Sequence, residues 1–245
     1  MAYISIISPV YRAEHLITEF VSRICAAVTQ ITDDFEIILI EDGSPDNSWA
    51  EIEKACQTNN KVKGVKLSRN FGQHNSISAG MELASGDYIC LLDCDLQHNP
   101  DYIPQLYQKI QEGYDIVYTK TIQRKHSSLK NLSAVLYYKF FTLIGGKSFD
   151  PNIGSYTLLS RKVVNAYNAF NDYRKAFLPA LKWAGFEYAV ISIKHSTRFQ
   201  GTSSYTLGKL IKHAINVSVA NSDRLLYFSI YMGIFFSFLA CIGIL

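Results

Sequence analysis

The chain has 245 residues, of which 48% are hydrophobic and 18% are charged, and its formal net charge is +3. This composition excludes a largely disordered protein, because the apolar residues are numerous enough to form a core of ordinary size. The small net charge gives no reason to expect nucleic acid as a partner. The five cysteines contain no Cys-x-x-Cys pair, which argues against a zinc site and indicates reduced thiols.

Two kinds of pattern alternate in the first half of the sequence. Short apolar runs rich in β-branched residues predict strands at residues 3–8, 35–40, 62–67, 88–92 and 115–118. Helical periodicity lies between them, at residues 14–29, 48–58, 75–84 and 101–111. This alternation predicts an α/β fold with a parallel sheet and helices on both faces. Ligands bind such sheets beyond the carboxyl ends of the strands, so we expect the site there.

The second half is less regular. Residues 156–159 and 187–194 are candidate strands. Residues 129–143 and 206–220 have the pattern of amphipathic helices, which either pack on the domain or rest on a membrane surface.

The last segment, residues 225–245, contains no charged residue and is long enough to cross a bilayer. We therefore predict a transmembrane helix there. Lys209, Lys212 and Arg224 precede it, which indicates that the domain before it faces the cytoplasm. Because the sequence stops where this helix ends, we expect the chain to be a fragment of a longer membrane protein.

Acidic residues mark the end of the fourth predicted strand, in the segment LLDCDLQHNP at residues 91–100. Asp93 and Asp95 are separated by one residue, so their carboxylates can converge on one hard cation such as Mg²⁺ or Mn²⁺. Gln97 adds a neutral oxygen two residues later. A solvated acidic turn is the alternative interpretation, since an isolated Asp-x-Asp pair is common by chance.

Polar residues also follow the other predicted strands. The first strand ends in SPVYRAEH, where Tyr11 is suited to stack on a base and Glu14 to accept hydrogen bonds from the base or its ribose. The second ends in IEDGSPDNSW, where Asp42 precedes a turn. The third ends in LSRNFGQHNS, where Arg69 is suited to meet a phosphate or an acidic partner. All of these residues are expected at the same edge of the sheet.

These motifs together resemble family 2 glycosyltransferases with the GT-A fold. The segments that carry the resemblance are IISPVYRAEHLI, EIILIEDGSPDNS, LSRNFGQHNSISAGMELASGDYICLLDCDLQHNP and RFQGTSSY. The branch that they resemble is that of the polyprenyl-phosphate glycosyltransferases, the dolichol-phosphate mannose synthase-like enzymes. The resemblance covers about residues 3–210. It implies a Rossmann-like nucleotide-diphospho-sugar transferase domain at residues 1–205, a juxtamembrane amphipathic helix at 206–224 and the transmembrane helix at 225–245.

The resemblance also implies roles for the residues that bind the donor. Pro9, Tyr11 and Glu14 match contacts to the base and ribose, and Asp42 matches the residue that reads the base. Asp93, Asp95 and Gln97 match the site for the metal and the diphosphate.

A second set of residues is implied to bind the acceptor or to close the site. Arg198, Gly201, Ser203 and Tyr205 match a loop that closes over the donor and acceptor phosphates, and Arg198 joins Asp93 and Asp95 as a predicted catalytic residue. Lys120 and Arg124 represent part of the family's basic acceptor-binding stretch. Ser155 stands where the family often has an acidic residue.

The function expected from the resemblance is an inverting transfer of a sugar from a UDP- or GDP-sugar to undecaprenyl or dolichyl phosphate, at the cytoplasmic face of the cell membrane. A lipid monophosphate is already anionic at neutral pH and needs no strong base, which is consistent with a serine at position 155. Two alternatives remain open: transfer to a hydroxyl of a lipid-linked glycan, and a non-catalytic nucleotide-binding scaffold. A homo-oligomer also remains open.

Overall fold

The computed structural model describes residues 3–121, 153–170, 176–194 and 224–244. The chain divides into two units, one formed by residues 1–123 and 152–201 and the other by residues 124–151 and 202–245. The amphipathic helices predicted at residues 129–143 and 206–220 lie outside the described residues. The predicted domain boundaries at residues 205 and 224 stay predictions.

Strands and helices alternate at the start of the first unit, as predicted. They are β1 (Ile4–Val10), α1 (Ile17–Val28), β2 (Phe35–Glu41), α2 (Ser48–Thr58), β3 (Val62–Lys66), α3 (Gln73–Leu83), β4 (Tyr88–Leu91), the 3-10 helix η1 (Pro100–Tyr102), α4 (Ile103–Ile110) and β5 (Ile116–Thr121). Every predicted strand and helix of this half is confirmed, with ends that differ by a few residues.

The rest of the first unit contains β6 (Ile153–Ser160), α6 (Arg161–Ala169), α7 (Phe177–Ala184) and β7 (Tyr188–Ile193). The two strands confirm the candidate strands at 156–159 and 187–194, whereas the sequence patterns did not predict α6 and α7. The seven strands form one sheet in the order β3-β2-β1-β4-β6-β5-β7.

The prediction of a parallel sheet is wrong in one respect, because the sheet is mixed. β6 runs antiparallel to both of its neighbours, with Leu91 of β4 and Tyr118 of β5 each opposite Thr157. The other adjacent pairs are parallel. An apolar run shows that a segment is a strand but carries no information on its direction, so the reversal of β6 could not be read from the sequence.

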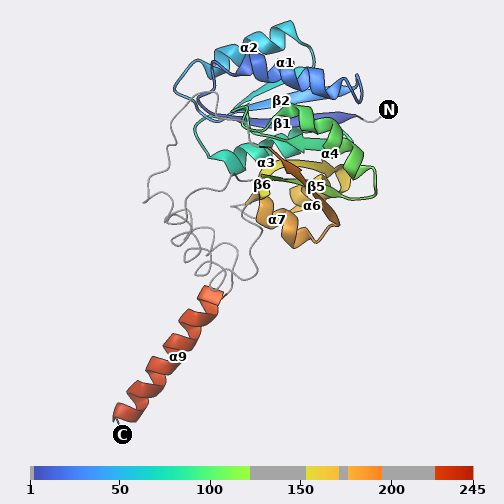
Figure 1. The fold of residues 1–245 in the computed structure, drawn as a ribbon. Coiled ribbons are helices and arrows are strands. Elements are labelled where there is room, and N and C mark those ends of the chain that lie inside the picture. Colours follow the sequence, from blue (N-terminus) through green and yellow to red (C-terminus); the bar gives the residue numbers. More distant parts are fainter. Residues whose placement is uncertain (1–2, 122–152, 171–175, 195–223, 245) are drawn as a thin grey trace, which may run out of the picture. The chain divides into compact units, whose positions relative to one another are not determined.

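Helices cover both faces of the sheet, as predicted (Figure 1). The core on one face joins residues of α1 and α4 to alternate residues of the strands, such as Ile4 and Ile6 of β1. On the other face α3 packs directly on the strands, where a Cβ added to Gly80 would lie 2.4 Å from Ile7 and 2.8 Å from Ile40. α6 and α7 contact α3 and each other.

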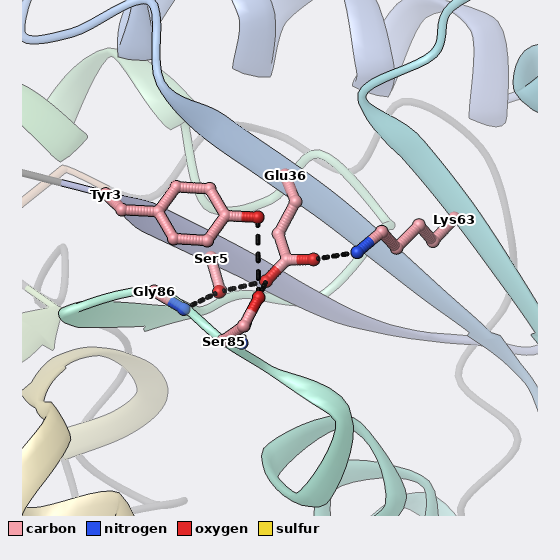
Figure 2. Close-up of polar contacts among 6 residues, drawn as sticks. All are labelled: Tyr3, Ser5, Glu36, Lys63, Ser85 and Gly86. Carbon is pink, nitrogen blue, oxygen red and sulfur yellow. Dashed lines mark hydrogen bonds and ion pairs between the residues drawn. The ribbon is translucent and has the colours of Figure 1, made fainter.

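A buried carboxylate joins the strands near their amino-terminal ends (Figure 2). Glu36 of β2 is 2% exposed and accepts hydrogen bonds from Ser5 Oγ at 2.6 Å, Ser85 Oγ at 2.7 Å and the Ser85 backbone N–H at 2.9 Å. Its second oxygen binds Lys63 Nζ at 2.6 Å. Ser5 Oγ also accepts the backbone N–H of Gly86 at 2.8 Å. The group therefore links β1, β2, β3 and the start of β4, and we call it the Glu36 cluster.

Helix α9 (Arg224–Ile244) is the described element of the second unit. It carries exposed apolar side chains along its length, among them Tyr231 at 67% and Phe238 at 64% exposure. Nevertheless, none of the helices in the described segments is both long enough and apolar enough to cross a membrane. This finding does not support the transmembrane helix predicted at residues 225–245.

Candidate functional site

Most of the predicted site residues that the structure describes lie at or after the carboxyl ends of β1 to β5. These strands run in the same direction, so their carboxyl ends lie at one edge of the sheet. The first half of β6 reaches the same edge from the opposite direction. Because Leu91, the last residue of β4, is paired with Thr157, the preceding Ser155 lies beyond β4 and beside the loop that follows it. We call this edge the ligand edge.

The acidic loop after β4 is held by hydrogen bonds from two different elements. Asp93 Oδ1 accepts a hydrogen bond from Gln73 Nε2 at 2.7 Å, and Asp93 Oδ2 accepts one from Ser155 Oγ at 3.0 Å. Asp95 Oδ1 accepts the backbone N–H of Gln97 at 3.1 Å. The turn between them places Leu96 at a φ of +57°. The predicted metal ligands therefore form one compact turn, in which the described contact of Gln97 is through its backbone.

The electrostatics of this loop favour binding of a positive charge. Burial raises the pKa of Asp93, and although His98 and the hydrogen bonds of Ser155 and Gln73 oppose this, the like charge of Asp95 raises it further. A divalent cation would relieve the repulsion between the two carboxylates. Within the described residues, no three His, Cys, Asp or Glu side chains lie close enough to form a metal site on their own.

The cysteine between the two aspartates belongs to the buried core. Cys94 is 6% exposed, and burial together with the charges of Asp93 and Asp95 raises the pKa of its thiol to about 12. A thiol must lose its proton to act as a nucleophile or a metal ligand. Cys94 is therefore a packing residue beneath the acidic loop.

Asp42, which follows β2, holds the loop after β3. Its side chain is buried, and its two oxygens accept the backbone N–H groups of Phe71 at 2.7 Å and Gly72 at 2.9 Å. The turn beside it approaches the same loop closely, since a Cβ added to Gly43 would lie 2.4 Å from the backbone nitrogen of Asn70. Asp42 is thus at the ligand edge as predicted, and its described role is to fix this loop.

The loop after β1 is joined to the loop after β2. Glu14 Oε2 accepts the backbone N–H of Asn47 at 2.8 Å, and Ser44 Oγ accepts the N–H of Arg12 at 3.1 Å. Arg12 has a φ of +54°, and its guanidinium carbon lies 5.4 Å from the centre of the Tyr11 ring, which is 46% exposed. Tyr11 therefore presents an accessible aromatic surface, as its predicted stacking role requires, whereas Glu14 contacts the backbone of Asn47 and the side chain of His15.

Two strained residues coincide with this edge. Arg12 and Leu96 are the non-glycine residues with positive φ in the described part of the chain, and each follows one of the adjacent strands β1 and β4. A positive φ costs a side-chain-bearing residue about 1–2 kcal/mol. Strain of this kind tends to collect at functional sites, where the surrounding structure enforces it.

The remaining predicted residues divide into those that the structure describes and those that it does not. Pro9 lies in β1 opposite Ile40, and Lys120 lies in β5 opposite Ile153 of β6. Arg69 is exposed, with its guanidinium carbon 4.8 Å from the ring centre of Phe71. The predicted residues outside the described part of the chain are Arg124, Arg198, Gly201, Ser203 and Tyr205.

Gln73 contacts a predicted metal ligand, Asp93, although the sequence patterns did not indicate it. It is the first residue of α3 and lies directly after Gly72 in the segment RNFGQ, of which only Arg69 was assigned a role. Its contact with Asp93 depends on the position of β4 in the sheet. A long amide at the start of a helix is a weak signal by itself.

The chain matches known proteins in both sequence and fold. The model of glycosyl transferase family 2 matches residues 5–167. Undecaprenyl-phosphate 4-deoxy-4-formamido-L-arabinose transferase of Shewanella sediminis is 39% identical over 212 residues, which are 85% of this chain and 63% of that protein. The protein of the same name from Proteus mirabilis is 32% identical over 210 residues, which are 85% of this chain and 64% of that protein. This chain therefore spans less than two thirds of the length of either relative.

A solved structure shares the fold. Glucosyl-3-phosphoglycerate synthase of Mycobacterium tuberculosis, crystallised with Mn²⁺, UDP-glucose and phosphoglyceric acid, superposes with a TM-score of 0.62 at 16% identity. The superposition covers 88% of this chain and 77% of that one. The mixed α/β sheet with its ligand edge is thus a GT-A-like fold, and with the family match over residues 5–167 the chain belongs to glycosyl transferase family 2.

Proposed function

We propose that this chain is part of an inverting glycosyltransferase that moves a sugar from a nucleotide-diphosphate sugar to a polyprenyl phosphate. The observation that carries the proposal is the pair Asp93 and Asp95 in one turn at the ligand edge, where Gln73 and Ser155 hold Asp93 and the backbone of Gln97 holds Asp95. The two relatives named as undecaprenyl-phosphate sugar transferases support the class of acceptor.

A divalent cation fits the residues present. Mg²⁺ and Mn²⁺ take oxygen ligands and are commonly held by one or two carboxylates together with substrate phosphates. Asp93 and Asp95 provide the carboxylates, and no third acidic or histidine ligand in the described residues is close enough to complete a cage without substrate. The fold is shared with a synthase that was crystallised with Mn²⁺ and UDP-glucose. When bound, the cation would stabilise the negative charge that develops on the leaving diphosphate.

We expect the donor to lie between two groups of described residues. Tyr11 offers an exposed ring for stacking on the base, and Asp42 and the loop it holds lie beside it in the order of the strands. Asp93 and Asp95 would receive the diphosphate end of the donor. An oxygen of the acceptor phosphate then attacks the anomeric carbon from the side opposite the diphosphate, the bond to the diphosphate oxygen breaks, and the nucleoside diphosphate leaves.

Ser155 favours a phosphate acceptor over a hydroxyl acceptor. A phosphate monoester has a second pKa of ~6 and is already anionic at neutral pH, so it needs no base. A sugar hydroxyl is protonated at that pH and needs a carboxylate to remove its proton. The Ser155 hydroxyl donates its hydrogen bond to Asp93 and cannot serve as that base. For this reason transfer to a lipid-linked glycan is the second candidate.

We further propose that the reaction takes place at the cytoplasmic surface of a membrane. A polyprenyl phosphate has a long apolar tail and a charged head, so the bilayer presents its phosphate at the surface. The aromatic and aliphatic side chains that α9 exposes, among them Tyr231, Phe235 and Phe238, favour contact with lipid over contact with water.

Identification of the product would test the function. Membranes that contain the protein and undecaprenyl phosphate are incubated with Mn²⁺ and a panel of UDP- and GDP-sugars, and the lipid products are identified by mass spectrometry. We expect a single sugar joined to the lipid through one phosphate, and no product with the Asp95→Asn variant. A sugar added to a lipid-linked glycan would support the second candidate, and nucleotide binding without any transfer would support a scaffold.

A further inference from the structure

The side chain of Asp93 is fixed by two hydrogen bonds, one to each oxygen. Gln73 Nε2 donates to Oδ1 at 2.7 Å, and Ser155 Oγ donates to Oδ2 at 3.0 Å. The two donors come from the start of α3, which precedes the acidic loop along the chain, and from β6, which follows it. A carboxylate has about four lone-pair positions. The two contacts therefore set the orientation of Asp93 and leave one position on each oxygen for a ligand.

Gln73 is itself anchored by the loop that precedes it. The backbone N–H groups of Phe71 and Gly72 donate to Asp42, and Asn75 Nδ2 donates to the carbonyl of Phe71 at 2.7 Å. On the other side, the backbone at Asn70 approaches the Cβ position of Gly43 to 2.4 Å. Several contacts thus hold the backbone just before Gln73. They fix the position from which the Gln73 side chain extends toward Asp93.

The loop between β3 and α3 spans the ends of two strands that are not neighbours in the sheet. Asp42 follows β2 and Asp93 follows β4, and β1 lies between these two strands in the sheet. Three consecutive residues, Phe71, Gly72 and Gln73, contact Asp42 and Asp93 in turn. The loop therefore connects Asp42, which is expected to contact the nucleotide base of the donor, with Asp93, which is expected near its diphosphate.

We propose that Gln73 is a positioning residue that orients Asp93 toward the divalent cation. This inference rests on the proposed function, because it assumes that Asp93 binds the cation. Side chains that hold a metal ligand in place typically change metal affinity by about 10–100-fold when they are lost. Gln73 is exposed, so its removal leaves no cavity in the core. The loss should appear in cation binding and not in stability.

The test compares two substitutions of the same chemical type. Gln73→Met keeps the length of the side chain but removes the hydrogen-bond donor. Gln105→Met is the matched control, because Gln105 is an exposed glutamine of α4 with no described hydrogen bond. Binding of Mn²⁺ is measured by electron paramagnetic resonance with saturating UDP and, separately, GDP. Melting temperatures are recorded for each variant, and turnover is measured over a range of Mn²⁺ concentrations.

We expect Gln73→Met to raise the Kd for Mn²⁺ by about tenfold or more, with an unchanged melting temperature and with turnover that recovers at high Mn²⁺. Ser155→Ala should weaken binding in the same way, and Gln105→Met should not. If Gln73→Met binds Mn²⁺ as tightly as the unmodified chain while Asp93→Asn does not bind it, the positioning role is wrong and the metal site stands. If the unmodified chain binds no Mn²⁺, the metal site is wrong and the positioning role falls with it.

Discussion

The two ends of the sheet both contain buried or half-buried carboxylates, but the environments of these carboxylates are opposite. At the amino-terminal end, burial acts to raise the pKa of Glu36, yet Lys63, Ser5 and Ser85 donate to it and lower the value to about 2 (Figure 2). At the ligand edge, burial and the neighbouring Asp95 raise the pKa of Asp93 despite two hydrogen bonds.

This difference is the one expected between a structural carboxylate and a carboxylate that binds a ligand. Glu36 has a cation and three other donors in the folded chain, so its charge is satisfied and contributes to stability. Asp93 accepts two hydrogen bonds and is stabilised by His98, but its burial and the neighbouring Asp95 still raise its pKa, so a bound cation would favour its charged form. The carboxylate is therefore stabilised by the chain itself at one end of the sheet, and at the other end a cation would stabilise it further.

The largest expected effect comes from removing a charge at the ligand edge. Asp95→Asn keeps an oxygen that can accept the Gln97 N–H but removes one metal-binding anion. We expect turnover to fall by more than about a hundredfold, while the melting temperature stays the same or rises because repulsion with Asp93 is lost. Steady-state kinetics and thermal unfolding check both parts. Normal turnover by a folded Asp95→Asn protein would contradict the metal site.

Replacing a carboxylate by an amide at the other end of the sheet should reduce stability and leave turnover unchanged. Glu36→Gln removes the charge that Lys63 and the serine donors stabilise, and we expect the free energy of unfolding to fall by about 2–3 kcal/mol. Turnover per folded molecule should not change. Urea unfolding and kinetics on the folded fraction give the two values. A loss of turnover without a loss of stability would show that the Glu36 cluster is not merely structural.

Protonation of Glu36 should contribute to the pH dependence of the free energy of unfolding. Its ordinary pKa is 4.5 and its folded value is about 2, so between these values the unfolded chain binds more protons than the folded chain. The stabilisation by Glu36 is therefore complete above about pH 4.5 and is lost as the pH falls toward about 2. Urea midpoints over this range should fall more steeply for the unmodified chain than for Glu36→Gln. Parallel curves would contradict the assignment.

A smaller effect is expected from two glycines that flank the Asp42 contact. Gly43 and Gly72 have φ values of +63° and +90°, but only at Gly43 would an added Cβ meet backbone, at 2.4 Å from Asn70 N. We expect Gly72→Ala to cost about 1–2 kcal/mol of stability from backbone strain and Gly43→Ala to cost more and to weaken binding of UDP or GDP. Calorimetry on both variants compares them. Equal losses would mean that the close approach is not important.

The smallest effect is expected from Lys63. Its side chain is 57% exposed, whereas that of Glu36 is 2% exposed, so water screens the ammonium group, and the three serine donors still hold the carboxylate when the lysine is lost. Lys63→Met should therefore destabilise the chain less than Glu36→Gln does, and added salt should reduce the difference. Urea unfolding at low and high ionic strength measures it. A larger loss than that of Glu36→Gln would mean that the lysine, and not the serine donors, satisfies Glu36.

Much of the architecture followed from the sequence alone, because the relevant forces are local. The alternation of apolar strand runs with helical periodicity identified β1 to β5 and the helices between them, since each pattern reflects the repeat of its own element. Asp93 directly follows an apolar run and Asp42 follows another after a single glutamate, which was enough to place both at the carboxyl ends of strands. The family resemblance also came from contiguous motifs, and the family match confirmed it.

The tertiary structure alone decided which of these motifs meet. The antiparallel course of β6 brings Ser155 to Asp93 across 62 residues of sequence, and the order of the strands brings Gln73 to the same carboxylate from 20 residues away. Neither contact is encoded in the pattern around the residues themselves. A carboxylate acquires its function from the donors and charges that the fold places around it, which is why Glu36 and Asp93 differ although each belongs to, or follows, a buried strand.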